Sequence, residues 1–107
     1  MSGQAARIVH DGPVYRIEGP VTMASTESLV QEGRRLFEGG EVTVDLAGVS
    51  EADSAALSLL LQWVRDAAGT GRRVSFTNLP AGLQSLAVLY GVSELFPTLP
   101  SSNDASA

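Results

Sequence analysis

The chain of 107 residues contains no cysteine. This absence excludes disulfide bonds, thiolate metal sites and thiol nucleophiles, so any chemistry has to come from other side chains. His10 is the only histidine, and one imidazole without cysteine forms no cluster with the spacing of metal ligands. We therefore predict no metal site, and we expect the His10 side chain to be solvated.

Long apolar runs and an excess of basic charge are also missing. No apolar stretch approaches the roughly 20 residues that a membrane-spanning helix needs, and residues 1–7 lack the order of a secretory signal. The formal net charge of −5 argues against a basic groove for nucleic acid and against electrostatic binding to anionic lipid. We expect a soluble cytoplasmic protein that binds neither nucleic acid nor the membrane directly, and whose partners are neutral or basic at the contact.

The chain has none of the common phosphate-binding loops. Neither G-x-x-x-x-G-K-[ST] nor G-x-G-x-x-G occurs among its 11 glycines, so this chain alone is not expected to hold or hydrolyse a nucleotide. Asp45, Glu51 and Asp53 are the nearest approach to a carboxylate group, but we expect Asp45 to end a strand and Glu51 to lie on a loop. No second group with a catalytic role accompanies them, which predicts a protein that is not an enzyme and needs no cofactor.

The length of the chain is that of one small domain, which buries about two-thirds of its unfolded surface. Residues 1–107 are interpreted as a single domain with a core over about 8–97. Residues 98–107 are rich in Ser, Asn and Ala and show no periodicity, which predicts a flexible tail.

The hydrophobic periodicity predicts strands that alternate with helices. Strands are expected at 6–10, 14–18, 42–46 and 73–77, and helices at 25–37, 54–68 and 78–91. We expect the first helix to end at Gly39-Gly40, and we interpret residues 92–96 as a final edge strand, with a helical turn as the alternative. This order is typical of an α/β fold with a mixed sheet of four to five strands and three to four packed helices.

The helix expected over residues 54–68 has an unusually wide apolar arc. At about 100° per residue, the stripe expected to face the core comprises Leu57, Leu60, Leu61, Val64 and Ala68. A second apolar flank comprises Ala56, Leu59, Trp63 and Ala67, and a polar stripe comprises Ser54, Ser58, Gln62 and Arg65. Packing of the second flank on the preceding helix is favoured over a partner interface, because large apolar patches are uncommon on monomers.

Either Asp53 or Ser54 is expected to cap this helix, since both residue types are favoured at that position. If Asp53 is the cap, Ser54 lies in the first turn with a free hydroxyl near the positive end of the helix dipole. A phosphate there would gain about 0.3–1 kcal/mol from the dipole, whereas burying it under a partner without a cation would cost several kcal/mol. Phosphorylation of Ser54 would therefore switch binding and leave folding intact.

The pattern Asp45-Leu46-x-x-Val49-x-x-x-Asp53-Ser54-x-x-Leu57 resembles the signature of STAS domains, a family named from sulphate transporters and anti-sigma-factor antagonists. Within the family, Leu59-Leu60-Leu61 and the run Leu86-Ala87-Val88-Leu89-Tyr90-Gly91-Val92 resemble the MlaB branch. The resemblance covers residues 8 to 97 and implies a STAS-like fold without catalysis. Ser54 matches the position of the phosphorylatable residue of the sigma-factor regulators, and of a threonine at the ATPase contact in the MlaB branch.

The MlaB branch implies a regulatory and assembly subunit. Its members bind the cytoplasmic ATPase of an ABC transporter, which also contains a permease and a lipid-binding protein and moves phospholipid in Gram-negative bacteria. That process maintains the lipid asymmetry of the outer membrane, and the subunit lies peripherally on the inner membrane through its partner. On this basis we expect partner contacts at Asp53, Ser54, Ser58 and Gln62.

The alternative function is that of an anti-sigma-factor antagonist with Ser54 as the phosphoacceptor. Many STAS domains carry glycine where this chain has Ala56, and alanine adds a methyl group and removes backbone freedom at a point of close approach. That departure counts against a kinase substrate.

Overall fold

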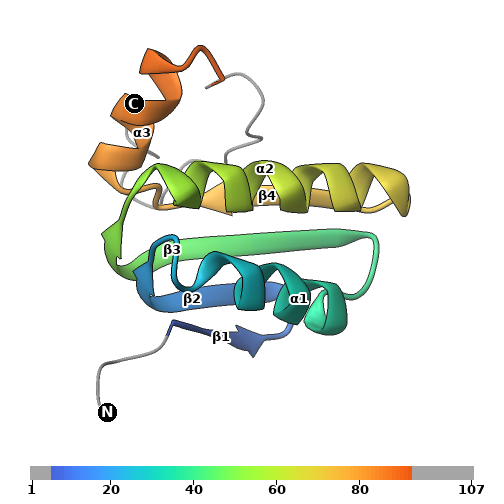
Figure 1. Cartoon of the computed structure of the whole chain (residues 1–107). Coiled ribbons are helices and arrows are strands. Elements are labelled where there is room, and N and C mark those ends of the chain that lie inside the picture. The colour runs from blue at the N-terminus through green and yellow to red at the C-terminus, as the bar shows by residue number, and fades with distance from the viewer. Residues whose placement is uncertain (1–5, 93–107) are drawn as a thin grey trace, which may run out of the picture.

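The computed structural model describes residues 6–92, and Figure 1 shows the arrangement of its elements. In chain order these are β1 (Arg7–Asp11), β2 (Val14–Val21), α1 (Thr26–Leu36), β3 (Glu41–Ala52), α2 (Ser54–Gly69), β4 (Arg73–Thr77) and α3 (Ala81–Leu89). The four strands form one sheet in the order β1-β2-β3-β4. β1 is antiparallel to β2, and the other pairs are parallel, which confirms the expected mixed α/β fold.

α1 and α2 are the crossover connections between the parallel strands. Right-handed crossovers that step across a sheet in one direction place their helices on the same face. Figure 1 accordingly shows α1 in front of β2 and α2 in front of β4, and the two helices pack on each other. The residues buried between helices and sheet include Ile17, Val44 and Phe76 from the strands and Leu29, Leu60 and Trp63 from the helices.

The buried face of α2 is rotated from the expected one. Leu57 and Leu60 are buried, but Leu61 and Val64 are only half-buried, and Ala68 is exposed. The second flank of Ala56, Leu59, Trp63 and Ala67 is buried throughout. The rotation arises because α2 is covered by the sheet, by α1 and by α3. Trp63 of this flank lies against Gly33 and Phe37, which confirms the predicted packing on the preceding helix for this residue, and the buried flank is not available to a partner.

β3 runs further than the alternation of its side chains predicted. Asp45 lies inside the strand and Glu51 near its end, so the expectations that Asp45 ends a strand and that Glu51 lies on a loop are wrong. The reason is an irregular register with β2, which shifts between Arg16 and Glu18 and again between Gly19 and Pro20. These shifts disturb the two-residue period on which the sequence prediction relied.

α1 ends earlier than the predicted stop at Gly39-Gly40. Its last residue is Leu36, and Phe37 is extended with φ −68° and ψ 127°. The Tyr15 hydroxyl donates to the Leu36 carbonyl at 3.1 Å and accepts from the Glu38 amide at 3.3 Å. These bonds fix the end of α1 on the sheet and draw Phe37 into the core, while Gly39 forms a later turn with φ +84°.

Two expectations concern residues beyond the described range. The expected edge strand falls outside it from residue 93 onward, as does the expected tail over 98–107, and Val92 belongs to no strand. Within residues 6–92, no helix combines the length and the apolar character that a membrane span requires.

Candidate functional site

Asp53 is the N-cap of α2. Its backbone is extended, with φ −121° and ψ −170°, and its Oδ1 accepts from the Ala55 amide at 2.9 Å. Its Oδ2 accepts from the Met23 amide at 3.3 Å. One carboxylate therefore serves two purposes: it satisfies a free N–H of the first turn, and it ties the loop between β2 and α1 to the start of α2.

Ser54 is consequently the first residue of the helix and not its cap. Its side chain is exposed, and Ser58 is exposed one turn later on the same stripe. Among residues 6–92, no group forms a hydrogen bond with the Ser54 hydroxyl. We use the name docking face for Asp53, Ser54, Ser58 and Gln62, the four residues at which the sequence analysis expects partner contacts. A hydroxyl here can accept or donate to a partner at the positive end of the helix dipole.

Gln62 differs from the other three residues of the docking face. It is half-buried, and its Nε2 donates to Asp66 Oδ1 at 3.0 Å. Its amide nitrogen is thus used inside the protein, so the fully accessible part of the docking face is its N-terminal end. Sequence spacing placed Gln62 on the polar stripe of the helix but gave no sign of this internal bond.

Met23 is a candidate contact residue that the sequence analysis missed. Its side chain is 80% exposed, and its backbone amide is held by Asp53 across a separation of 30 residues. A single exposed methionine in a loop carries no periodic signal, and its position beside the docking face depends on tertiary structure. Large, flexible apolar side chains are common at protein contacts.

Asp53→Ala tests the cap. We expect the free energy of unfolding to fall by about 1 kcal/mol, because the Ala55 amide loses its acceptor. Urea unfolding measures the change, and amide exchange at Ala55 should accelerate. Asp53→Asn retains a side-chain oxygen and should cost less; equal stability of Asp53→Ala and the parent chain would contradict the assigned role.

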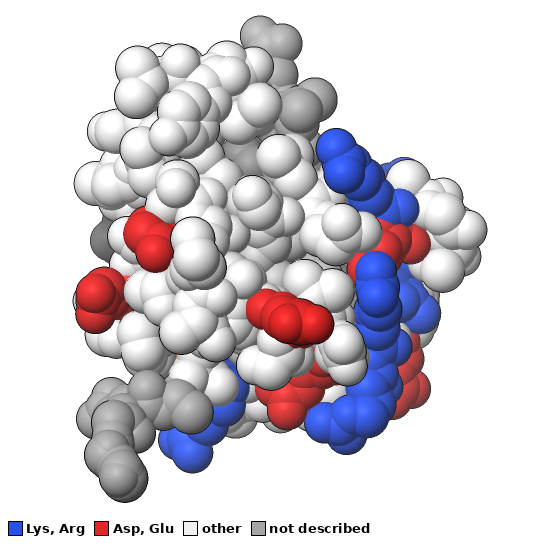
Figure 2. All heavy atoms as spheres, viewed as in Figure 1, with Lys and Arg blue, Asp and Glu red and all other residues white. Residues whose placement is uncertain are grey.

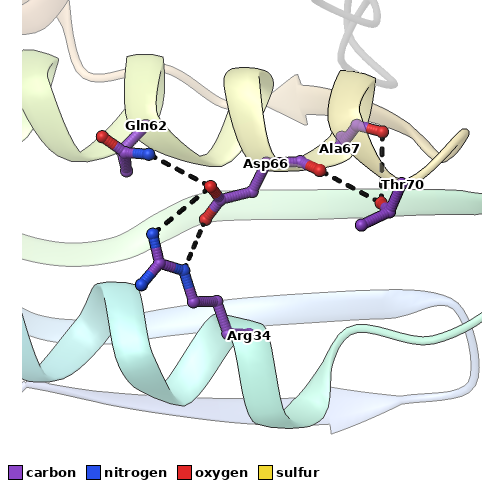
Figure 3. A network of polar contacts seen from close by, with 5 residues as sticks. All are labelled: Arg34, Gln62, Asp66, Ala67 and Thr70. Atoms are coloured by element: carbon purple, nitrogen blue, oxygen red, sulfur yellow. Dashed lines mark hydrogen bonds and ion pairs between the residues drawn. The ribbon is translucent and has the colours of Figure 1, made fainter.

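A network of polar contacts joins the C-terminal half of α2 to α1 (Figure 3). Arg34 Nε donates to Asp66 Oδ2 at 2.9 Å, and the same carboxylate accepts from Gln62. The hydrogen bond from Arg34 holds the pKa of Asp66 below its usual value, and the bond to Asp66 raises the pKa of Arg34. The network meets the docking face only at Gln62, and it links the two helices through the Arg34–Asp66 pair.

The lowered pKa of Asp66 predicts a pH-dependent contribution to stability. This stabilisation is fully present above the unfolded pKa of about 3.9 and is lost as the pH falls through the lower folded value. Asp66→Asn should therefore lower the free energy of unfolding by about 0.5–1 kcal/mol at neutral pH, and by progressively less in acid. Urea unfolding at several pH values measures the difference between the two chains, and a constant difference down to the acid limit would contradict the assignment.

Charge is distributed unevenly over the molecule. Figure 2 shows arginine side chains gathered on the side where α1 and α2 end. By contrast, residues 17–33 and 36–64, which include the whole of β3 and the start of α2, contain no Lys or Arg. Glu51 and Asp53 are exposed there. The surroundings of Ser54 therefore favour a neutral or basic partner surface.

Comparison with known proteins identifies related folds. The family model described as MlaB, STAS domain, matches residues 5–99. The anti-sigma factor antagonist SpoIIAA in its unphosphorylated form aligns over 95% of this chain and 92% of its own, with 11% identity and a TM-score of 0.68. A STAS domain protein from Planctomyces limnophilus aligns over 95% of each chain, with 18% identity and a TM-score of 0.67.

A membrane transporter also contains a domain of this fold. Murine Slc26a9, an anion transporter, aligns over 92% of this chain and 18% of its own, with 20% identity and a TM-score of 0.65. A search of the curated proteins finds no match. At these identities the structural likeness concerns the fold.

Proposed function

The chain belongs to the MlaB-type STAS domain family, and from that premise we propose that it is a non-enzymatic subunit that binds the ATPase of a phospholipid-transporting ABC transporter. In this role it lies in the cytoplasm, on the inner membrane through its partner. The complex includes a permease and a lipid-binding protein and serves the lipid asymmetry of the outer membrane.

The observation that carries the proposal is the exposure of Ser54 at the start of α2. Because Asp53 provides the cap, the Ser54 hydroxyl is left for an external partner. Ser58 extends the same exposed stripe, and the exposed Met23 side chain supplies apolar area beside it. A partner surface with basic or neutral groups and a small apolar recess would match these features.

Co-expression with the transporter tests the proposal. The tagged chain is produced with the ATPase, permease and lipid-binding protein of the same bacterium, and the complex is purified in detergent. We expect the ATPase to be retained in a fixed ratio through size-exclusion chromatography. Loss of the ATPase at that step, with both proteins folded, would contradict the proposal.

The second candidate function is that of an anti-sigma-factor antagonist. The observation that favours it is the same exposed hydroxyl, which a kinase could reach without unfolding the helix. Incubation with a cognate anti-sigma-factor kinase and ATP, followed by intact-mass measurement and peptide mapping, separates the two functions. A phosphate on Ser54 favours the antagonist, whereas an unmodified chain that retains the ATPase favours the transporter subunit.

A further inference from the structure

A cavity lies at the opposite end of α2 from the docking face. It has a volume of about 430 Å³ and is lined by residues from the ends of α1 and α2 and from the start of β4. Phe37, Trp63 and Val74 contribute apolar wall, and Arg34, Arg65, Arg72 and Asp66 contribute charged groups. Its size and its mainly apolar wall with few polar groups are those of a small-molecule site.

The charged groups of the cavity have an excess of positive charge. Arg34 is paired with Asp66 at 2.9 Å. Arg72 Nε donates to the Gly39 carbonyl at 2.9 Å, but within residues 6–92 neither Arg72 nor Arg65 has a carboxylate partner. Two arginine charges are therefore uncompensated at this cavity, in a chain whose net charge is −5. Figure 2 shows that this is the side of the molecule where arginine side chains gather.

The wall of the cavity also contains an unpartnered hydrogen-bond donor. Trp63 is 2% exposed, and its buried Nε1 has no acceptor among the described residues. A buried donor without a partner costs about 1–3 kcal/mol. Gly33 also lines the cavity, and its backbone lies close to that nitrogen. A Cβ at Gly33 would be only 2.5 Å from Nε1.

We propose that the cavity binds a small amphiphilic organic anion. Its acidic group pairs with Arg65 and Arg72, because guanidinium groups match carboxylate, sulfonate and phosphate oxygens. Its apolar part contacts Phe37 and Trp63 in the wall of the cavity. Inorganic anions would gain nothing from the apolar wall. This site is separate from the docking face, so the proposal stands or fails independently of the transporter partner.

Three probes test separately the contributions of the acidic group and of the apolar part of the proposed ligand. They are 8-anilinonaphthalene-1-sulfonate, its uncharged analogue N-phenyl-1-naphthylamine, and inorganic phosphate. Trp63 is the only tryptophan, so the ¹⁵N-labelled protein gives a single indole N–H resonance that reports on the cavity. We expect the sulfonate to shift this resonance and to bind at least about tenfold more tightly than the neutral analogue. Phosphate alone should leave it unchanged at millimolar concentration.

Paired variants test the role of the arginines. Arg65→Gln with Arg72→Gln should weaken binding of the sulfonate by about tenfold or more. The double variant Arg7→Gln with Arg16→Gln has the same net charge but changes residues that pair with Glu18 on β2, and it should bind as the parent does. The single variant Arg65→Gln controls for misfolding, because Arg65 is exposed and the Arg72 bond to Gly39 is kept. We expect it to fold normally and to lose part of the affinity for the sulfonate.

Any one of the following results would overturn the proposal. They are equal binding of the charged and neutral naphthalenes, equal losses in the two double variants, and an indole resonance that stays in place while the probe binds. A shift caused by phosphate alone would assign the cavity to inorganic anions and would overturn the amphiphile in particular.

Discussion

Gly33→Ala lowers the free energy of unfolding by about 1–2 kcal/mol, although alanine is the better helix former. A Cβ at this position would lie 2.5 Å from Trp63 Nε1 and 2.9 Å from Phe37 Cε2. Both rings are rigid and buried, and they contact each other edge to face with centroids 5.1 Å apart. At contacts this short the overpacking cost is about 2–3 kcal/mol, in the upper part of its usual range, and the gain in helix propensity of about 1 kcal/mol offsets only part of it.

Two further variants isolate the cause of this loss in urea or thermal unfolding. Gly82 lies in α3, where an added Cβ would meet nothing within 4 Å, so Gly82→Ala should leave stability equal or slightly higher. In a Trp63→Phe background the loss from Gly33→Ala should shrink, because the nearest ring atoms are gone and the two effects are coupled. An undiminished loss in that background would contradict the contact as the cause.

We expect Ser54→Glu to reduce the affinity for the proposed ATPase partner by about 100-fold or more while leaving the melting temperature nearly unchanged. A factor of 100 corresponds to about 2.7 kcal/mol, and burying an unpaired carboxylate at a contact costs several kcal/mol. The neighbouring Glu51 and Asp53 increase the repulsion. Stability is preserved because the first turn of a helix tolerates an acidic residue, which interacts favourably with the dipole.

Titration of the purified ATPase with each variant measures this effect, with thermal unfolding as the test of folding. Gln31→Glu adds the same charge at an exposed position in the middle of α1, and it should bind as the parent does. Ser54→Ala removes the hydroxyl without adding charge and should cause a smaller loss than Ser54→Glu. Comparable losses for Gln31→Glu and Ser54→Glu would show that net charge, and not the docking face, governs binding.

Local patterns predicted the order of elements but not all of their ends. The expected strand over 73–77 coincides with β4, and the expected helix over 54–68 differs from α2 by one residue. The predicted end of α1 was wrong because the helix is ended by a contact from outside it. The Tyr15 hydroxyl of β2 donates to the Leu36 carbonyl. The predicted extent of β3 was too short because the register of this strand with β2 is irregular.

In the candidate site, too, the sequence predicted the features that depend on neighbouring residues and missed those that depend on tertiary contacts. Capping is a local property, so the sequence restricted the cap to Asp53 or Ser54, and the structure assigns it to Asp53. Met23 beside the docking face, the Arg34–Asp66 pair and the cavity at Trp63 all join segments that are far apart in the sequence. Hydrophobic periodicity carries no information about such contacts.

Hydrogen–deuterium exchange of the chain, alone and bound to the ATPase, tests the docking face most directly. We expect binding to slow amide exchange in peptides that contain Met23 and the first two turns of α2, with little change in β1 and at the Trp63 cavity. Slowed exchange confined to β1 or to the cavity, with the start of α2 unaffected, would contradict the account.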